Sequence, residues 1–248
     1  MHRLAYTFFG PPAGVPVVLL HHGLGSSAAW QAQIPALTQA GFRVLAYDRW
    51  GYGASEPRPQ LHTPWFEPDV ADLAALLDAV GLGQVVLVGH SDGGTIALYF
   101  AARYPGRVQA LVTVAAHVYV DPTMHPGMEA LRQVYETSEA FRQALDRTHQ
   151  GRGSEVFEMW YAAWHRPGVL DWDARPLLRY VKAPTLVVQG TADEYAPPEH
   201  AQAIAAALPN ARLALVPDAS HMLPQKHPDA FNPLLLAYLK TVVLGDTA

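Results

Sequence analysis

The chain has no cysteine among its 248 residues, which excludes disulfides, thiolate nucleophiles and zinc sites built on sulfur. It is also poor in basic residues, with 17 Lys and Arg against 22 Asp and Glu, so its composition does not favour a nucleic-acid partner. No apolar run reaches the roughly 18 residues of a membrane span. Residues 1–10 lack a secretory apolar region and a cleavage site. We therefore expect a cytoplasmic protein without a membrane partner.

Histidines are present, but their spacing does not indicate a metal site. His21 and His22 are adjacent, and no carboxylate or third histidine follows them at the spacing of metal ligands. We therefore expect neither a metal nor a cofactor.

Short apolar runs alternate with helical patterns along most of the chain. The runs are rich in β-branched residues, as is typical of buried parallel strands, and they cover residues 15–20, 43–47, 84–88, 108–116, 185–189 and 212–216. Residues 4–9 alternate in polarity and predict an edge strand. Helical patterns cover residues 28–40, 68–80, 94–104, 198–208 and 229–239. This alternation predicts an α/β fold with a doubly wound, mostly parallel sheet.

One stretch, which we call the lid segment (residues 118–181), breaks the alternation. It lacks strand-like runs, is rich in Trp and Tyr, and has helical patterns at residues 127–135, 138–148 and 154–165. We expect a core of residues 1–117 and 182–248. The lid segment would then lie over the carboxyl ends of the strands, where such sheets bind ligands.

The motif Gly89-His90-Ser91-Asp92-Gly93 joins a predicted strand to a predicted helix. A G-x-S-x-G turn in this context forces the serine into a strained, exposed conformation for which only glycines leave room. This indicates that Ser91 is a nucleophile. The alternative is an ordinary serine at the N-terminus of a helix, which would not need flanking glycines.

A serine nucleophile needs a base to take its proton and a third group to orient that base. Asp193 and His221 each follow a predicted strand, in the chain order Ser, Asp, His. We predict that His221 is the base and Asp193 the acid. The alternatives are His227 as the base, and Glu194 or Asp121 as the acid.

The loop that follows the strand at residues 15–20 is rich in glycine, with Gly23 and Gly25 in the run at residues 21–26. Glycines let the backbone approach a substrate, and backbone N–H groups form the oxyanion hole in acyl transfer. We predict that the N–H groups of Leu24 and Asp92 form this hole.

Together these residues resemble the α/β-hydrolase superfamily over nearly the whole chain. The matching motifs are the His22-Gly23 dipeptide, DRWGYGAS at residues 48–55, the turn at residues 89–93, GTADEYAP at residues 190–197 and SHMLPQKHP at residues 220–228. The resemblance implies a catalytic triad of Ser91, Asp193 and His221 without a cofactor.

Asp92 stands where many members of the superfamily have an apolar or amide side chain. Within the superfamily the chain resembles the valacyclovir hydrolase-like serine esterases, through SDGG at residues 91–94, AAHVYV at 115–120, APTLVVQG at 183–190 and PDASH at 217–221. That resemblance implies that Asp92 binds the ammonium group of an α-amino-acid ester. The alternative is that Asp92 only stabilises the N-terminus of its helix or sets the polarity of the pocket.

Further candidates for substrate binding are side chains that follow strands or lie in the lid segment. We predict that His117, Trp160, Trp164 and Met222 line the pocket with Asp92. Other candidates are Trp50, Tyr119, Met124, Met128, Tyr161 and Trp172, whereas we expect Tyr52 and Trp65 to be structural.

The function predicted from these residues is hydrolysis of carboxylic esters of small, partly apolar acids through an acyl-enzyme on Ser91. Alternatives on the same triad are acyl transfer, perhydrolysis and carbon–carbon bond hydrolysis. The last is disfavoured because such hydrolases usually have tryptophan at the position of Met222. A non-enzymatic alternative is a small-molecule receptor of the same fold. The sequence does not indicate an oligomeric state.

Overall fold

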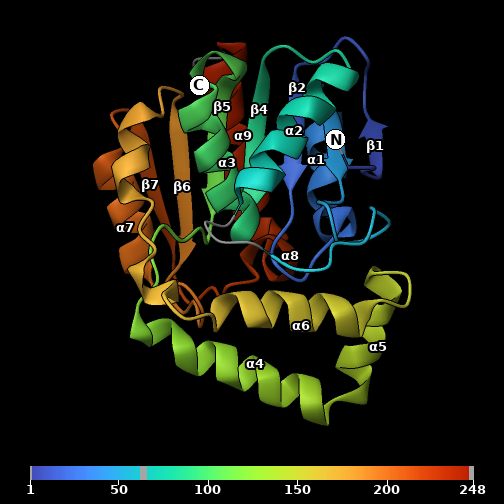
Figure 1. The fold of residues 1–248 in the computed structure, drawn as a ribbon. Helices are drawn as coiled ribbons and strands as arrows, with labels where there is room; N and C mark the ends of the chain where they lie inside the picture. Colours follow the sequence, from blue (N-terminus) through green and yellow to red (C-terminus); the bar gives the residue numbers. More distant parts are fainter. Residues whose placement is uncertain (1, 62–65, 246–248) are drawn as a thin grey trace.

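The computed structural model describes residues 2–61 and 66–245, so Trp65 lies outside the described residues. Its centre is a seven-stranded sheet in the order β1-β3-β2-β4-β5-β6-β7 (Figure 1). The strands are β1 (Tyr6–Phe9), β2 (Pro16–Leu20), β3 (Arg43–Tyr47), β4 (Val85–His90), β5 (Val108–Val114), β6 (Thr185–Gly190) and β7 (Ala211–Val216). Strand β1 is an edge strand antiparallel to β3, and the other pairings are parallel. The predicted fold class is confirmed.

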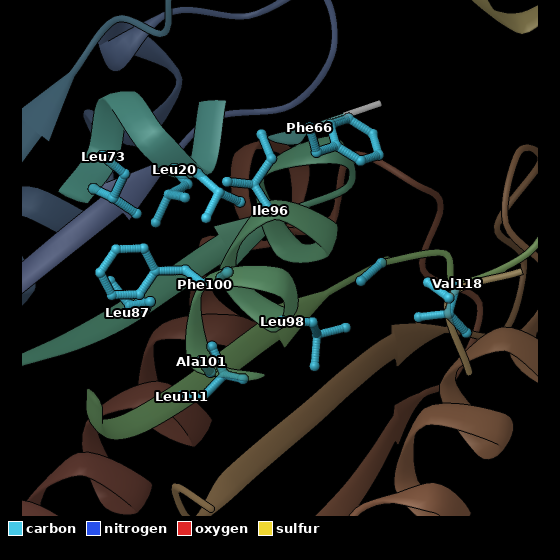
Figure 2. Packing of buried hydrophobic residues seen from close by; sticks show 14 of the residues in the cluster. Leu20, Phe66, Leu73, Leu87, Ile96, Leu98, Phe100, Ala101, Leu111 and Val118 are labelled. Carbon is cyan, nitrogen blue, oxygen red and sulfur yellow. The ribbon is translucent and has the colours of Figure 1, made fainter. Parts of the chain in front are cut away.

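Helices cover both faces of the sheet, as Figure 1 shows. One face is covered by α1 (Gln33–Gln39) and α9 (Pro228–Leu239), and the other by α2 (Glu67–Ala79), α3 (Asp92–Arg103) and α7 (Pro198–Ala207). A short helix, α8 (Leu223–Lys226), precedes α9. Figure 2 shows Ile96, Leu98 and Phe100 of α3 among the buried side chains of the strands and α2. This packing makes α3 the central helix of its face.

Two predictions about the elements were wrong. The predicted helix at residues 28–40 is a 3₁₀ turn at Ser27–Trp30 followed by α1. The break agrees with Pro35, which lacks an N–H and is tolerated only in the first turn of a helix. Strand β7 is not buried, since Leu213 and Leu215 are 40% and 41% exposed. It lies at the edge of the sheet, and β6 is its one partner strand among the described residues.

The lid segment contains three α-helices between β5 and β6: α4 (His125–Thr137), α5 (Glu139–Thr148) and α6 (Gly153–Trp164). In Figure 1 they lie across one end of the sheet. Its only β-pairing among the described residues is an isolated bridge between Tyr119 and Asp173. An apolar cluster joins α6 to the core through Val156, Met159 and Ala163 against Tyr52 and Leu61. Within the described part of the chain, no helix is long and apolar enough to span a membrane.

Candidate active site

The strand order brings together the loops that carry the predicted site residues. Strands β2 and β4 are parallel neighbours, so the glycine-rich loop after β2 lies beside the turn that follows β4. Strands β6 and β7 are neighbours in the same way, so the loops that contain Asp193 and His221 meet. These loops follow the carboxyl ends of their strands, the usual ligand side of an open parallel sheet.

Ser91 lies between β4 and α3 in a strained backbone conformation, with φ 54° and ψ −123°. Two glycines make this turn possible. A Cβ on Gly89 would lie 2.3 Å from the carbonyl oxygen of Gly93, and a Cβ on Gly93 would lie 2.2 Å from that of Leu20. Although Ser91 occupies the N-cap position, its side chain forms no capping hydrogen bond with the described residues. Ser91 therefore does not act as an ordinary N-cap residue.

We expect Gly93→Ala to destabilise the protein by about 3 kcal/mol, because the new methyl group meets backbone atoms of β2 that cannot rotate away. Thermal or urea unfolding of the purified variant measures this effect. Gly83→Ala is the matched control, since its added Cβ meets no described atom within 4 Å. Equal stability of the two variants would contradict the steric argument.

Asp193 and His221 form a close pair. The His221 Nδ1 lies 2.8 Å from Oδ2 and 2.9 Å from Oδ1 of Asp193. Asp193 also accepts hydrogen bonds from the N–H groups of Tyr195 and Ala196 and from the Gln189 amide. Burial raises the pKa of Asp193, but the electrostatic effect of His221, the hydrogen bond with its ring and the backbone hydrogen bonds outweigh burial and lower the pKa. The carboxylate is thus held ionised against the imidazole.

None of the alternative acid and base residues takes the place of the Asp193–His221 pair. His227 is exposed at the end of α8. Glu194 accepts a hydrogen bond from the backbone N–H of His221, not from its ring. Asp121 binds the N–H and hydroxyl of Thr123, and its nearest histidine nitrogen, on His200, is 3.9 Å away.

His90 links the serine turn to the loop of His221. The His90 Nε2 donates to the backbone oxygen of His221 at 2.8 Å, and its ring lies between those of His221 and His22, with centroids 5.2 Å from each. Burial lowers the pKa of His22 to about 3, with further electrostatic contributions from His221, Arg49 and His149. His22 is therefore neutral at pH 7.

A cavity of about 280 Å³ lies between the sheet and the lid segment. Ser91, Asp92 and His221 line it together with the other predicted residues Leu24, His117, Trp160, Trp164 and Met222. Of the further candidates, Met124 and Met128 line the cavity. The described residues that line it do not include Trp50, Tyr119, Tyr161 or Trp172. Sequence reasoning did not identify Leu131, Phe141, Leu145 or Lys226, which also line the cavity, and it considered Glu194, another lining residue, only as an alternative acid.

Asp92 is only 2% exposed and belongs to a chain of buried charges. Its Oδ2 lies 3.7 Å from Nη2 of Arg49, and its Oδ1 lies 3.6 Å from Nε2 of His117. Arg49 also faces Asp69 at 3.6 Å, and Asp69 pairs with Arg58 at 2.7 Å. Two carboxylates and two guanidinium groups therefore share this region. The sequence did not indicate it, because these four residues are far apart in the chain and no local pattern links them.

The burial of Asp92 raises its pKa, although Arg49 and, more weakly, His221 and Trp160 act in the opposite direction. The carboxylate oxygens of Asp92 lie beyond hydrogen-bond distance of Arg49 and His117, so Asp92 keeps acceptor capacity toward the cavity. His117 is neutral, because burial lowers its pKa well below the usual value, with smaller effects from His200 and His221.

The predicted oxyanion donors lie on two sides of the same space. Asp92 is the first residue of α3, so its N–H has no partner within the helix. Leu24 belongs to the loop after β2 and lines the cavity. Gly23 must lack a side chain, because a Cβ there would lie 2.1 Å from Nε1 of Trp160. Among the described residues, no group of three His, Asp or Glu side chains is placed to hold a metal.

Many known proteins are similar to this chain. Residues 16–176 match the family model of the alpha/beta hydrolase fold, and residues 150–247 match that of TAP-like proteins. The human serine hydrolase BPHL is 33% identical over 90% of this chain and 79% of its own length. A non-heme chloroperoxidase of Streptomyces lividans is 31% identical over 96% of both chains. The solved thermophilic esterase of Thermogutta terrifontis is 28% identical, with a TM-score of 0.75 over 96% of this chain and 93% of that one.

The chain belongs to the α/β-hydrolase fold family. The resemblance to valacyclovir hydrolase that the motifs predict is confirmed by the identity with BPHL.

Proposed function

We propose that the protein is a serine hydrolase that cleaves carboxylic esters. The observation that supports this most is the shared cavity. It joins Ser91, strained and free of a capping bond, to His221, whose Nδ1 is held 2.8 Å from Asp193. Membership of a family with hydrolase relatives agrees with this role.

In the proposed reaction, the Ser91 Oγ attacks the ester carbonyl while the Nε2 of His221 takes its proton. The N–H groups of Leu24 and Asp92 stabilise the oxyanion. When the tetrahedral intermediate collapses, the bond from the carbonyl carbon to the alkoxy oxygen breaks, and His221 returns the proton to the leaving alcohol. Water then attacks the acyl-enzyme and gives one proton to His221. When the bond from the acyl carbon to the Ser91 Oγ breaks, His221 returns this proton to Oγ, which releases the acid and free Ser91.

The cavity limits the acids that fit. Its volume of about 280 Å³ is near the lower limit for small-molecule pockets, and Trp, Met and Leu side chains dominate its lining. We therefore propose esters of small, partly apolar acids as substrates. The test is steady-state hydrolysis of p-nitrophenyl esters of increasing acyl length, and kcat/KM should rise with chain length and then fall. Absence of turnover on every ester would contradict the proposal.

Asp92 supports a narrower proposal, a preference for α-amino-acid esters. A buried carboxylate beside the oxyanion hole, with acceptor capacity toward the cavity, fits an ammonium group on the α-carbon. The preference should be modest, because Arg49 already offsets part of the charge of Asp92.

We expect Asp92→Asn to lower kcat/KM for aminoacyl esters about tenfold more than for matched acyl esters, the size of one lost charge-assisted hydrogen bond. Parallel kinetics on the two ester series measure the difference. Glu194→Gln, which removes another carboxylate from the cavity lining, should affect both series alike. An equal effect of Asp92→Asn on both series would remove the ammonium site and leave the esterase proposal standing.

Two alternatives can be tested with the same samples. The chloroperoxidase relative favours one of them, transfer of the acyl group to hydrogen peroxide instead of water. Formation of a peracid from ester and peroxide would show it. A receptor of this fold would release one equivalent of p-nitrophenol and stop, whereas the proposed esterase turns over many times.

A further inference from the structure

His149, at the end of α5, is completely buried between two loops of the core. Its Nδ1 accepts the backbone N–H of Gly53 at 2.9 Å, and its Nε2 faces the carbonyl oxygen of Leu24 at 3.1 Å. Because the Gly53 N–H has to donate, the ring proton must be on Nε2, which then donates to Leu24. A neutral imidazole satisfies both bonds. Burial lowers the pKa of His149, as do the nearby charges of Arg152 and Arg49.

The bond to Leu24 anchors the loop that we propose as one half of the oxyanion hole. Two residues earlier, the carbonyl oxygen of His22 is also held in place. It accepts hydrogen bonds from Nη2 of Arg49 at 3.1 Å and from Nδ1 of His21 at 2.8 Å. The peptide that carries the Leu24 N–H lies between these two anchors. One anchor comes from the core, and the other comes from the lid segment.

The lid segment has a second attachment that does not involve this loop. Arg152 donates to the carbonyl oxygens of Gly51, Gly53 and Ser55 at 2.8–3.2 Å. Arg152 and His149 therefore both hold the lid segment on the turn at residues 48–55. Of the two, only His149 also binds the loop at Leu24.

We propose that His149 is a positioning residue of the oxyanion hole, through which the lid segment sets the place of the Leu24 N–H. This inference rests on the proposed ester hydrolysis. An oxyanion donor acts on the transition state more than on the bound ester, so losing its position lowers kcat and leaves KM nearly unchanged.

The test compares two substitutions at position 149 that each keep one half of the imidazole. In His149→Gln the longer side chain brings an amide N–H to the place of Nε2 and keeps the bond to Leu24. In His149→Asn the amide oxygen replaces Nδ1 and the bond to Leu24 is lost. We expect His149→Asn to lower kcat about 30-fold and His149→Gln about threefold or less, with KM within about twofold in both. The Ki of phenylboronic acid, whose tetrahedral adduct places an oxygen in the hole, should rise in parallel with the loss of kcat.

Arg152→Ala is the control for simple loosening of the lid segment. It should lower the midpoint of thermal unfolding while kcat stays within about twofold of the wild type. Equal kcat in His149→Asn and His149→Gln, a change confined to KM, or a matching loss of kcat in Arg152→Ala would overturn the inference. If His149→Asn does not fold, a tenfold or greater loss of kcat in folded His149→Gln would overturn it as well. An inactive wild type would instead refute the proposed function.

Discussion

Ser91→Ala should reduce kcat/KM for p-nitrophenyl esters by about four to six orders of magnitude. The substitution removes the oxygen that forms the acyl-enzyme, and water held in its place lacks the orientation that the turn imposes on Ser91. The fold should be retained, since the Ser91 side chain makes no capping bond. Steady-state kinetics with circular dichroism measure both effects.

Ser154→Ala is a suitable control for Ser91→Ala, because Ser154 is exposed at the start of α6. Its activity should match that of the wild type. Ester turnover by Ser91→Ala within about tenfold of the wild type would mean that another group performs the chemistry.

Asp193→Asn should lower kcat by about four orders of magnitude. Asp193 accepts hydrogen bonds from Gln189, Tyr195 and Ala196 as well as from His221. In asparagine, one of the two side-chain atoms becomes a donor. If the side-chain NH₂ faces the His221 ring, Nδ1 of His221 must accept a hydrogen bond instead of donating one. The ring proton then moves to Nε2, which can no longer take the proton of Ser91 because it has no free lone pair. Single-turnover kinetics of acylation measure the loss directly.

The same substitution should change how stability depends on pH. The pKa of Asp193 is lowered in the folded protein, so its ionised form stabilises the fold above the unfolded-state pKa. That contribution is lost as pH falls through the folded-state pKa. The wild type should therefore exceed Asp193→Asn in thermal stability near neutral pH, and the gap should close as the pH falls below the usual range of an aspartate carboxyl. Asp171→Asn, at an exposed position of the lid segment, should not show this convergence.

Local patterns were enough to predict the core of the fold. β-branched apolar runs locate the strands, and the glycines around Ser91 predict the strained turn, in which Ser91 has a φ of 54°. The positions of Asp193 and His221 just after strands were sufficient to place both at one edge of the sheet. These features depend on residues close together in the chain, so local sequence patterns are sufficient to predict them.

The features that sequence reasoning missed depend on contacts between distant segments. Whether Arg49 is a surface charge or a buried partner of Asp92 is decided by the loops that close over it. The bond from His149 to Leu24 joins residues 125 positions apart, and no local pattern marks it. In the lid segment, Trp160 and Trp164 line the cavity. The neighbouring Tyr161 is not among the described lining residues and instead donates a hydrogen bond to Glu129. That difference follows from how α6 is rotated against the core.

The most direct test of the central claim, that Ser91 is a nucleophile activated by His221 and Asp193, is active-site titration with diethyl p-nitrophenyl phosphate. Attack by the serine oxygen on phosphorus forms a stable diethylphosphoryl-serine and releases p-nitrophenol. We predict one equivalent of p-nitrophenol for each chain and, by peptide mass spectrometry, a diethylphosphoryl group on Ser91. Release without modification of Ser91, or modification at another residue, would contradict the account.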